Sequence, residues 1–515
     1  MLSRYNRLNH MVEWHGLVQD LFESGPLRGL LYNRRRWLLL AAGVLFLVSV
    51  AIASGWLIAE FGVFVVAALV MGAVYAIAVL WDLEFAYLGV IGVVALLPFG
   101  SLPFNIGFTP TFLDLALLAL FGAWLLAFLL GDEQRLIGTP VGASVFAFAL
   151  MAIAAFVAGL SHGALTAYLI RHFAEVLLSI ALFFLVVNTV HDVGRLRRLM
   201  RWFILLSTAA ASLGIVFYLL PESLVIQLMS ALERFGYPTG PSVIWHIRDD
   251  PTLMKRAVAT SIHPNVLGSL LNFALAMLVP QLLVKRPIIP RWMVVLVGAI
   301  LGTCLVLTVS RSAMLGIASA VVILGVMRYR KLLALMLVVL LIFLALPISR
   351  NLMGHFIEGF MGEDLSTQMR LGEYRDTLTL IQRYPFLGVG FAGAPDIDIY
   401  VAVASLYLIV AAQMGLVGLG VFLVVLGQVF WRFWRHRVGV RALPALEPLW
   451  YGIHAAILGG AVSGIFDHYF FSIDFHHSVT LFWLMVGLAT AATELVIRDG
   501  PPTVEVARDF IAVEP

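Results

Sequence analysis

Hydrophobic blocks long enough to cross a bilayer alternate with short polar segments along almost the whole chain. A helix needs roughly 20 apolar residues to span the hydrocarbon core, so each block predicts a membrane-spanning helix. The pattern predicts an all-α, polytopic integral membrane protein with about 12–14 transmembrane helices. The predicted spans lie near residues 37–54, 56–81, 85–100, 111–130, 141–160, 173–190, 202–220, 262–284, 292–309, 312–327, 332–348, 402–430, 449–466 and 477–497. Two of them, 85–100 and 312–327, are short, so re-entrant or tightly packed helices are the alternative there.

Two long polar segments interrupt this alternation, at about 221–261 and 349–401. The first is predicted to contain a short helix up to Phe235, followed by a turn-rich stretch of glycine and proline. The second is the longest polar interruption in the chain. Each segment is therefore expected to fold over one end of the helix bundle.

An amphipathic helix is predicted inside the second polar segment and ends at Pro385, which cannot continue a helix. The apolar positions that recur at helical spacing are Leu371, Tyr374, Leu378 and Ile381. Arg370 and Glu373 fall on the polar side of this helix. We expect the other helices to hold it over a membrane-embedded pocket.

The composition agrees with a membrane protein. Of 515 residues, 61% are hydrophobic and only 12% are charged, which excludes an ordinary soluble domain. The only cysteine, Cys304, lies in an apolar run, so the chain has no intramolecular disulfide. We divide it into a basic N-terminal segment (1–36), one membrane domain (37–497) and a short tail (498–515).

Basic residues cluster on every second connection between the predicted spans. Lysine and arginine concentrate on the cytoplasmic side of membrane proteins, so the alternation predicts that both termini are cytoplasmic. The clusters on that side are Arg34–Arg36, Arg195–Arg201, Lys285–Arg291, Arg328–Lys331 and Arg432–Arg441. The segments 221–261 and 349–401 are then two long extracytoplasmic loops containing short helices.

Several arginines lie on the extracytoplasmic side at the ends of predicted spans, where a charge is costly unless it is paired or functional. Arg311 sits between two apolar runs with almost no loop to solvate it. Arg256 stands at the mouth of a span, and Arg370 lies on the polar side of the predicted helix. Guanidinium groups match phosphate oxygens, so these arginines are predicted to bind an anion, with snorkelling anchors as the alternative.

Some polar patterns are too weak to predict a ligand site. The glycine-rich stretch 388–393 formally matches a dinucleotide fingerprint, but it follows a helix and is interpreted as a tight turn. Asp396 with Asp398, and His476 with His477, contain metal-ligand types, but neither pair has a convincing ligand spacing. No metal site is therefore predicted.

Two further polar groups lie at the ends of spans. Asp467 is followed by His468, and an aspartate beside a histidine can tune a proton acceptor; a helix-capping cluster is the alternative. Arg171 and His172 stand one turn before Glu175, which predicts either an internal ion pair or a functional group.

The motifs of the second half resemble the O-antigen ligase and O-antigen polymerase superfamily. They are Arg256 with Ser261-Ile262-His263-Pro264-Asn265, Ser310-Arg311-Ser312-Ala313, Arg370 with Tyr384-Pro385-Phe386-Leu387-Gly388-Val389-Gly390, and Gln413-Met414-Gly415-Leu416-Val417-Gly418. The resemblance covers about residues 250–430. It implies glycan transfer from an undecaprenyl-diphosphate carrier to an acceptor hydroxyl at the outer face of the bacterial cytoplasmic membrane. It also implies no nucleotide, no nucleic-acid partner, no metal and no cofactor.

The resemblance assigns roles to individual residues. The donor diphosphate is expected to bind Arg256, Arg311 and Arg370. Family ligases usually carry a histidine in the segment that leads into the late span, where this chain has Ala404, so His468 with Asp467 is the predicted catalytic pair. The residues predicted to line the cavity are His263, Asn265, Arg171, Arg375 and Tyr374.

The sequence leaves the reaction open between a ligase and a polymerase, and the acceptor is either a glycan, a lipid or a protein. The alternative from another class is a transporter or flippase of a lipid-linked glycan. That class predicts ionisable residues at mid-bilayer and interrupted helices in matching halves. The charges here lie mainly at the extracytoplasmic ends of the spans, which favours the enzyme.

Overall fold

The fold is described from a computed structural model, in which residues 63–103, 107–131, 136–345, 365–392 and 403–500 are described, together with single positions between 44 and 59. The chain divides into two units, Met1–Trp81 and Asp82–Pro515. The apolar helix α4 (Val63–Trp81) belongs to the first unit, and all elements named below belong to the second. The predicted span 37–54 lies outside the described residues apart from single positions, as do Asp396 and Asp398.

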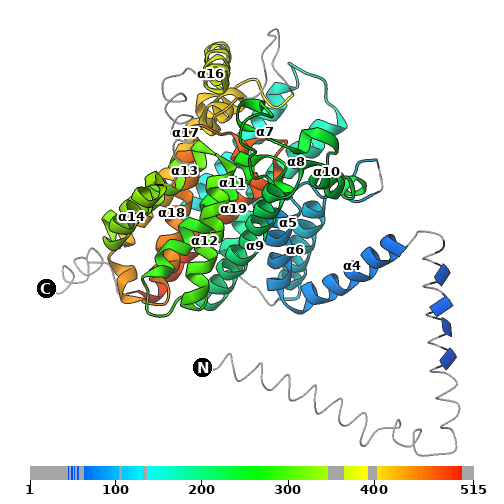
Figure 1. The fold of residues 1–515 in the computed structure, drawn as a ribbon, viewed down its shortest axis with the longest axis horizontal. Coiled ribbons are helices and arrows are strands. Elements are labelled where there is room, and N and C mark those ends of the chain that lie inside the picture. The colour runs from blue at the N-terminus through cyan, green and yellow to red at the C-terminus, as the bar shows by residue number, and fades with distance from the viewer. Residues whose placement is uncertain are drawn as a thin grey trace, which may run out of the picture. The chain divides into compact units, whose positions relative to one another are not determined.

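All regular elements in the described ranges are helices (Figure 1). The long helices are α5 (Leu83–Leu96), α6 (Phe112–Leu129), α7 (Pro140–Gly159), α8 (Ala167–Thr189), α9 (Val193–Leu219), α11 (Pro264–Leu278), α12 (Arg291–Thr308), α13 (Arg311–Met327), α14 (Lys331–Ala345), α16 (Leu365–Arg383), α17 (Leu406–His436), α18 (Glu447–Ser463) and α19 (His476–Asp499). Each predicted span from 56–81 onward coincides with one helix. Within the described part of the chain, eight helices are long and apolar enough to cross a membrane. The predicted all-α, polytopic fold is confirmed.

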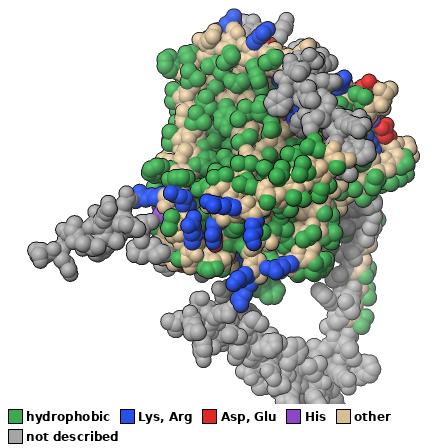
Figure 2. All heavy atoms as spheres, turned by 60° about the vertical axis from the view of Figure 1, so that its left-hand side comes forward, with side chains coloured by type: hydrophobic (Ala, Val, Ile, Leu, Met, Phe, Trp, Pro, Cys, Tyr) green, Lys and Arg blue, Asp and Glu red, His purple; other side chains and the backbone are tan. Residues whose placement is uncertain are grey.

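The centre of the bundle is formed by α11, α18 and α19. In the most apolar 18-residue stretch of the α11 and α19 regions, 83% and 89% of the residues are buried, compared with 22% in α6. Long helices pack side by side in the pairs α8 with α19, α11 with α18, and α13 with α18. Figure 2 shows hydrophobic side chains covering the flank of the bundle. An apolar flank suits a lipid environment, because the hydrophobic side chains that do not pack in the core can face the lipid tails.

The two ends of the bundle differ in character. Lysine and arginine side chains gather at one end, below the hydrophobic flank (Figure 2). The exposed Arg328, Arg330 and Arg435 belong to this end, because they lie at or after the ends of α13 and α17. The other end, which we name the α16 end, carries α16 (Figure 1). The segment 221–261 contains α10 (Glu222–Ser230), η1 (Glu233–Phe235), η2 (Gly240–Val243), η3 (Ile247–Asp249) and η4 (Ala259–Ser261), as its turn-rich sequence predicts.

A glycine-rich turn after α16 docks into a kink of α17. Gly388 and Gly390 have φ of +67° and +77°. The N–H of Val389 donates to Ala412 O (2.8 Å), and the N–H of Gly390 donates to Gln413 O (3.0 Å). Gly415 interrupts α17 with φ +69° and ψ −179°, a conformation that only glycine adopts readily. A Cβ atom at Gly388 or Gly415 would overlap backbone atoms of the opposite segment. The predicted tight turn is therefore confirmed.

Candidate functional site

A cavity of about 350 Å³ lies at the α16 end. Its walls come from residues 245–256, from the starts of α11 and α13, from α16 and from residues 467–469 after α18. The structure brings seven residues of the sequence-based site to this cavity: Arg256, Arg311, Arg370, Asp467, His468, His263 and Asn265. Segments separated by more than two hundred positions in the sequence thus contribute to one site.

Arg256 is held in one orientation by the protein itself. Its Nε donates to Thr308 O (2.8 Å), and its terminal nitrogen donates to Asn265 Oδ1 (2.7 Å). Burial lowers the pKa of Arg256 to about 10, so the side chain remains charged at neutral pH. A guanidinium fixed by two neutral acceptors keeps its positive charge available to an anion in the cavity.

Asp467 connects the elements that carry the arginines. The carboxylate is 3% exposed and accepts hydrogen bonds from Ser312 Oγ and from Asn265 Nδ2 (3.4 Å). The guanidinium of Arg370 lies 3.7 Å from its Oδ1. Burial raises the pKa of Asp467, and the nearby Arg370 opposes this rise. These contacts make Asp467 a positioning residue for α11, α13 and α16. Its oxygens contact Ser312, Asn265 and Arg370 instead of orienting the ring of His468.

Two histidines face the cavity in uncharged forms. Burial lowers the pKa of His468 to about 4 and that of His263 to about 3. His263 precedes α11, and its Nδ1 accepts from the N–H of Asn265 (3.2 Å) and from the hydroxyl of Tyr469 (3.1 Å). His263 is therefore a helix cap with a committed ring nitrogen. His468 contacts Tyr469 and Phe475 through its ring and is the better placed of the two to accept a proton.

The helix α16 is tied down over the cavity by two neighbouring residues. Glu373 Oε2 accepts the N–H of Ala404 (3.2 Å), and the hydroxyl of Tyr374 donates to Ala404 O (3.2 Å). Burial raises the pKa of Glu373. Arg370 lies one turn earlier on the same side of α16, so these bonds set its position. Ala404, at the position where family ligases usually carry histidine, itself lines the cavity.

The predicted apolar face of α16 is partly wrong. Leu371 and Leu378 are each 49% exposed, whereas Thr377 and Leu380 are buried. The helix covers a polar cavity, so it turns its polar side inward and presents these leucines outward. A hydrophobic repeat identifies the inward face only where the neighbouring surface is apolar.

Backbone strain is concentrated beside the cavity. Among the described residues, the non-glycine positions with positive φ are Arg248 (58°), Asp249 (55°), Ala259 (50°), Ile262 (61°) and Val309 (52°). This conformation is an outlier for the β-branched Ile262 and Val309. Arg248, Asp249 and Val309 line the cavity, and Ile262 precedes a lining residue. Strain of about 1–3 kcal/mol per residue persists where the surrounding structure enforces it, and such sites are often functional.

Three of the predicted lining residues do not line this cavity. Arg171 instead pairs with Glu175 (2.9 Å) and Asp114 (3.3 Å) in a separate cluster. Arg375 is exposed on α16, and Tyr374 anchors that helix. The sequence predicts all three on one side of the membrane, but helical spacing and loop position do not tell which residues of one side converge.

The structure also adds residues that sequence reasoning missed. Trp245, Asp249 and Glu373 line the cavity. Trp245 packs against the ring of His263, with ring centroids 4.6 Å apart. An antiparallel bridge between His246 and Lys255 returns the chain so that residues 245–249 face Arg256. The charged residues of the segment 245–256 could have been singled out from the sequence as site candidates. The sequence does not show that this segment folds back on itself and brings them to Arg256.

The fold and the cavity define a polytopic membrane protein with a polar, arginine-lined site at one end of its helix bundle. The family model for the O-antigen ligase matches residues 295–423, from α12 into α17, and this segment includes Arg311, Arg370 and Ala404. Over this segment the chain is therefore similar to the O-antigen ligase family. No curated protein matches the chain.

Proposed function

We propose that this protein transfers a glycan from an undecaprenyl-diphosphate carrier to an acceptor hydroxyl at the outer face of the bacterial cytoplasmic membrane. The observation that carries the proposal is the convergence of Arg256, Arg311 and Arg370 on one cavity at an end of the bundle. A site at this level receives a polar headgroup while the lipid tail stays among the helices. In the proposed orientation, the α16 end is extracytoplasmic, because the basic clusters lie at the other end.

The charges of the cavity suit an anionic donor. Its lining contains four arginines and three carboxylic acids, namely Arg248, Arg256, Arg311 and Arg370 against Asp249, Glu373 and Asp467. Burial raises the pKa of both Glu373 and Asp467, which favours their neutral forms and leaves the cavity more positive. A diphosphate diester carries two negative charges, and arginine forks bind phosphate oxygens in pairs.

The proposed reaction breaks the bond between the anomeric carbon of the donor glycan and the diphosphate oxygen, and the acceptor oxygen forms the new glycosidic bond. Negative charge develops on the departing diphosphate, where Arg256, Arg311 and Arg370 stabilise it. His468 is uncharged near pH 7 and accepts the proton of the acceptor hydroxyl. Asp467 acts through the arginines as a positioning residue. No metal ion or cofactor takes part in this scheme.

Reconstitution of the purified full-length chain in proteoliposomes tests the function. A lipid-linked glycan donor and a candidate acceptor are supplied, and two products are measured: the free carrier diphosphate and the elongated or glycosylated acceptor. The proposal predicts that both products appear in equal amounts. Movement of intact donor across the bilayer, with neither product formed, would instead support the transporter or flippase.

A further inference from the structure

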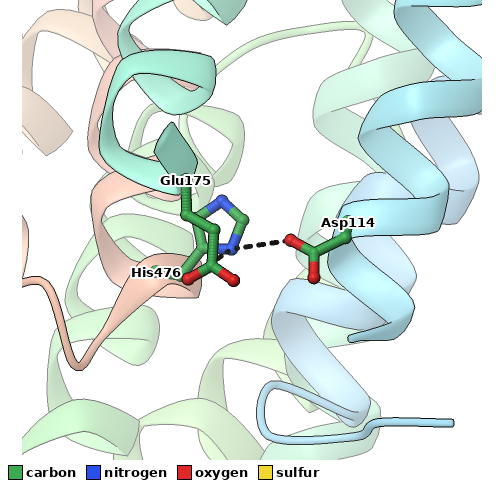
Figure 3. A group of neighbouring side chains, drawn as sticks. All are labelled: Asp114, Glu175 and His476. Carbon is green, nitrogen blue, oxygen red and sulfur yellow. Dashed lines mark ion pairs between the residues drawn. The ribbon is translucent and has the colours of Figure 1, made fainter. Parts of the chain in front are cut away.

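A second cluster of ionisable groups lies outside the arginine-lined cavity. It joins Asp114 at the start of α6, Glu175 in α8 and His476 at the start of α19 (Figure 3). Each residue offers one ligand atom, and these atoms all lie within 4.8 Å of one another. Three helices far apart in the sequence thus present an imidazole and two carboxylates to one point.

His476 is the member of this cluster that needs a partner. The residue is 7% exposed, and neither ring nitrogen has a hydrogen-bond partner in the described structure. Its Nδ1 faces Asp114 Oδ1 at 3.6 Å and Glu175 Oε2 at 3.8 Å (Figure 3). These separations are long for hydrogen bonds, but they are close to the roughly 3.4 Å between ligands that tetrahedral zinc, with bonds of about 2.0–2.2 Å, would impose.

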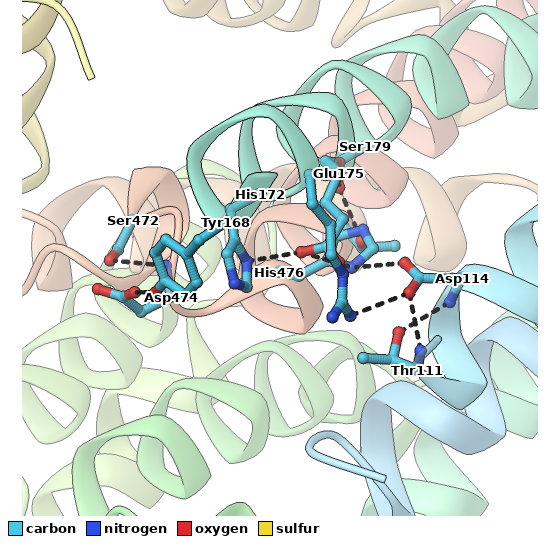
Figure 4. Close-up of polar contacts among 11 residues, drawn as sticks. Thr111, Asp114, Tyr168, His172, Glu175, Ser179, Ser472, Asp474 and His476 are labelled. Carbon is cyan, nitrogen blue, oxygen red and sulfur yellow. Dashed lines mark hydrogen bonds and ion pairs between the residues drawn. The ribbon is translucent and has the colours of Figure 1, made fainter. Parts of the chain in front are cut away.

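The surrounding groups orient both carboxylates (Figure 4). Arg171 donates to Glu175 Oε1 (2.9 Å) and to Asp114 Oδ2 (3.3 Å), while His172 Nδ1 lies 2.9 Å from Glu175 Oε2. The oxygens that face His476 are thereby fixed, as ligand carboxylates are by their outer hydrogen bonds. One arginine balances only one of the two carboxylates, so the cluster can accept a further positive charge.

We propose that Asp114, Glu175 and His476 bind one divalent transition-metal ion of the zinc type. One imidazole and two carboxylates suit Zn²⁺ with a fourth position for water, whereas Mg²⁺ and Ca²⁺ prefer oxygen ligands alone. The ion would join the ends of α6, α8 and α19. The hydroxyl of Tyr168, also in α8, donates to Asp474 Oδ1 (2.6 Å), so the same helix holds the loop that leads back to His468 (Figure 4).

Zinc binding to the purified, tag-free, full-length chain tests this proposal without reference to turnover. The protein is treated with a chelator, titrated with ZnCl₂ and separated from free metal, and its zinc content and melting temperature are measured. We expect one zinc ion per chain and a higher melting temperature with zinc. His476→Gln and Asp114→Asn should each weaken zinc binding at least tenfold, whereas His477→Gln should not.

The variants keep the test decisive if one of them fails to fold. Asp114→Asn retains an oxygen for the N–H of Thr111, which Asp114 now accepts at 2.8 Å, so the start of α6 can be preserved. Absence of zinc binding by the folded wild-type protein would overturn the proposal and leave a protonated His476 as the partner of the carboxylates. Unchanged zinc affinity in folded Asp114→Asn protein would overturn it equally.

Discussion

Acidification should protonate His468 only far below neutral pH. Burial lowers its pKa to about 4, compared with about 6.5 for an unperturbed histidine. If His468 is the proton acceptor, the turnover of the wild-type protein should stay nearly constant from pH 8 down to about pH 5.5 and fall to half near pH 4–5. Initial rates of transfer, measured across this range at donor concentrations well below KM so that they report the free enzyme, give the profile.

The same group makes a contribution to stability with a defined sign. The folded-state pKa is lower than the unfolded-state pKa, so the unfolded chain binds the proton more readily. The contribution of His468 is therefore fully present above about pH 6.5 and is lost as the pH falls towards 4. With these two values, about 2 kcal/mol of unfolding free energy should already be lost at pH 5.

Comparison with His468→Gln assigns this loss to the residue. The free energy of unfolding of each protein is measured by reversible unfolding in mixed micelles at pH 7 and at pH 5. The difference in this free energy between wild type and variant should change by about 2 kcal/mol between the two pH values. The comparison removes the contributions of Glu373 and Asp467, which both proteins share. A turnover midpoint near pH 6.5, or an unchanged stability difference between the two pH values, would refute the reasoning for His468.

Three further predictions concern the glycine turn, the orientation and the metal. Gly415→Ala should destabilise the protein by about 1–3 kcal/mol, because the φ of +69° and ψ of −179° at this position are strained for alanine. Gly427 lies on the same helix with nothing near its added Cβ atom, so Gly427→Ala should melt like wild type. In a background without Cys304, a cysteine at Glu363 should react with an impermeant reagent from outside and one at Gly439 should not; the reverse pattern would overturn the orientation. Chelation should lower the melting temperature but leave the initial rate of transfer unchanged at temperatures well below melting. Loss of the transfer rate, restored by Mg²⁺ or Mn²⁺, would contradict catalysis without a metal ion.

The membrane fold was predictable because its signal is local. Each predicted span from 56–81 onward became a helix, since a long apolar run has few alternatives in a bilayer. The ending of α16 before Pro385 and the turn at Gly388 were also local, because proline and glycine restrict the backbone at their own positions.

The composition of the site was only partly predictable. Arg256 and Arg311 were identified from the cost of a charge at a span end, and Arg370 from the polar side of the predicted helix, in each case together with the family resemblance. All three line one cavity. Arg171 is also an arginine at the end of a predicted span, but in the structure it pairs with Asp114 and Glu175. Helix packing, which the sequence does not show, decides which charges meet. That packing also separates neighbouring histidines.

His476 and His477 illustrate this separation. His476 faces two carboxylates, whereas the ring of His477 lies 4.8 Å from that of Phe99. The two positions are adjacent in the sequence, but successive residues of a helix point about 100° apart. A pair of histidines therefore cannot be assigned to one ion from adjacency alone.

The matched pair Arg370→Ala and Arg375→Ala tests the central claim most directly. Both arginines lie on α16, but Arg370 faces the cavity, with its side chain 22% exposed and 3.7 Å from Asp467, whereas Arg375 is exposed. Charge-assisted contacts contribute about 1.5–3 kcal/mol, so Arg370→Ala should reduce the transfer rate at least about tenfold. Arg375→Ala should retain the wild-type rate. Equal rates in the two variants would contradict the assignment of the arginine-lined cavity as the site of glycan transfer.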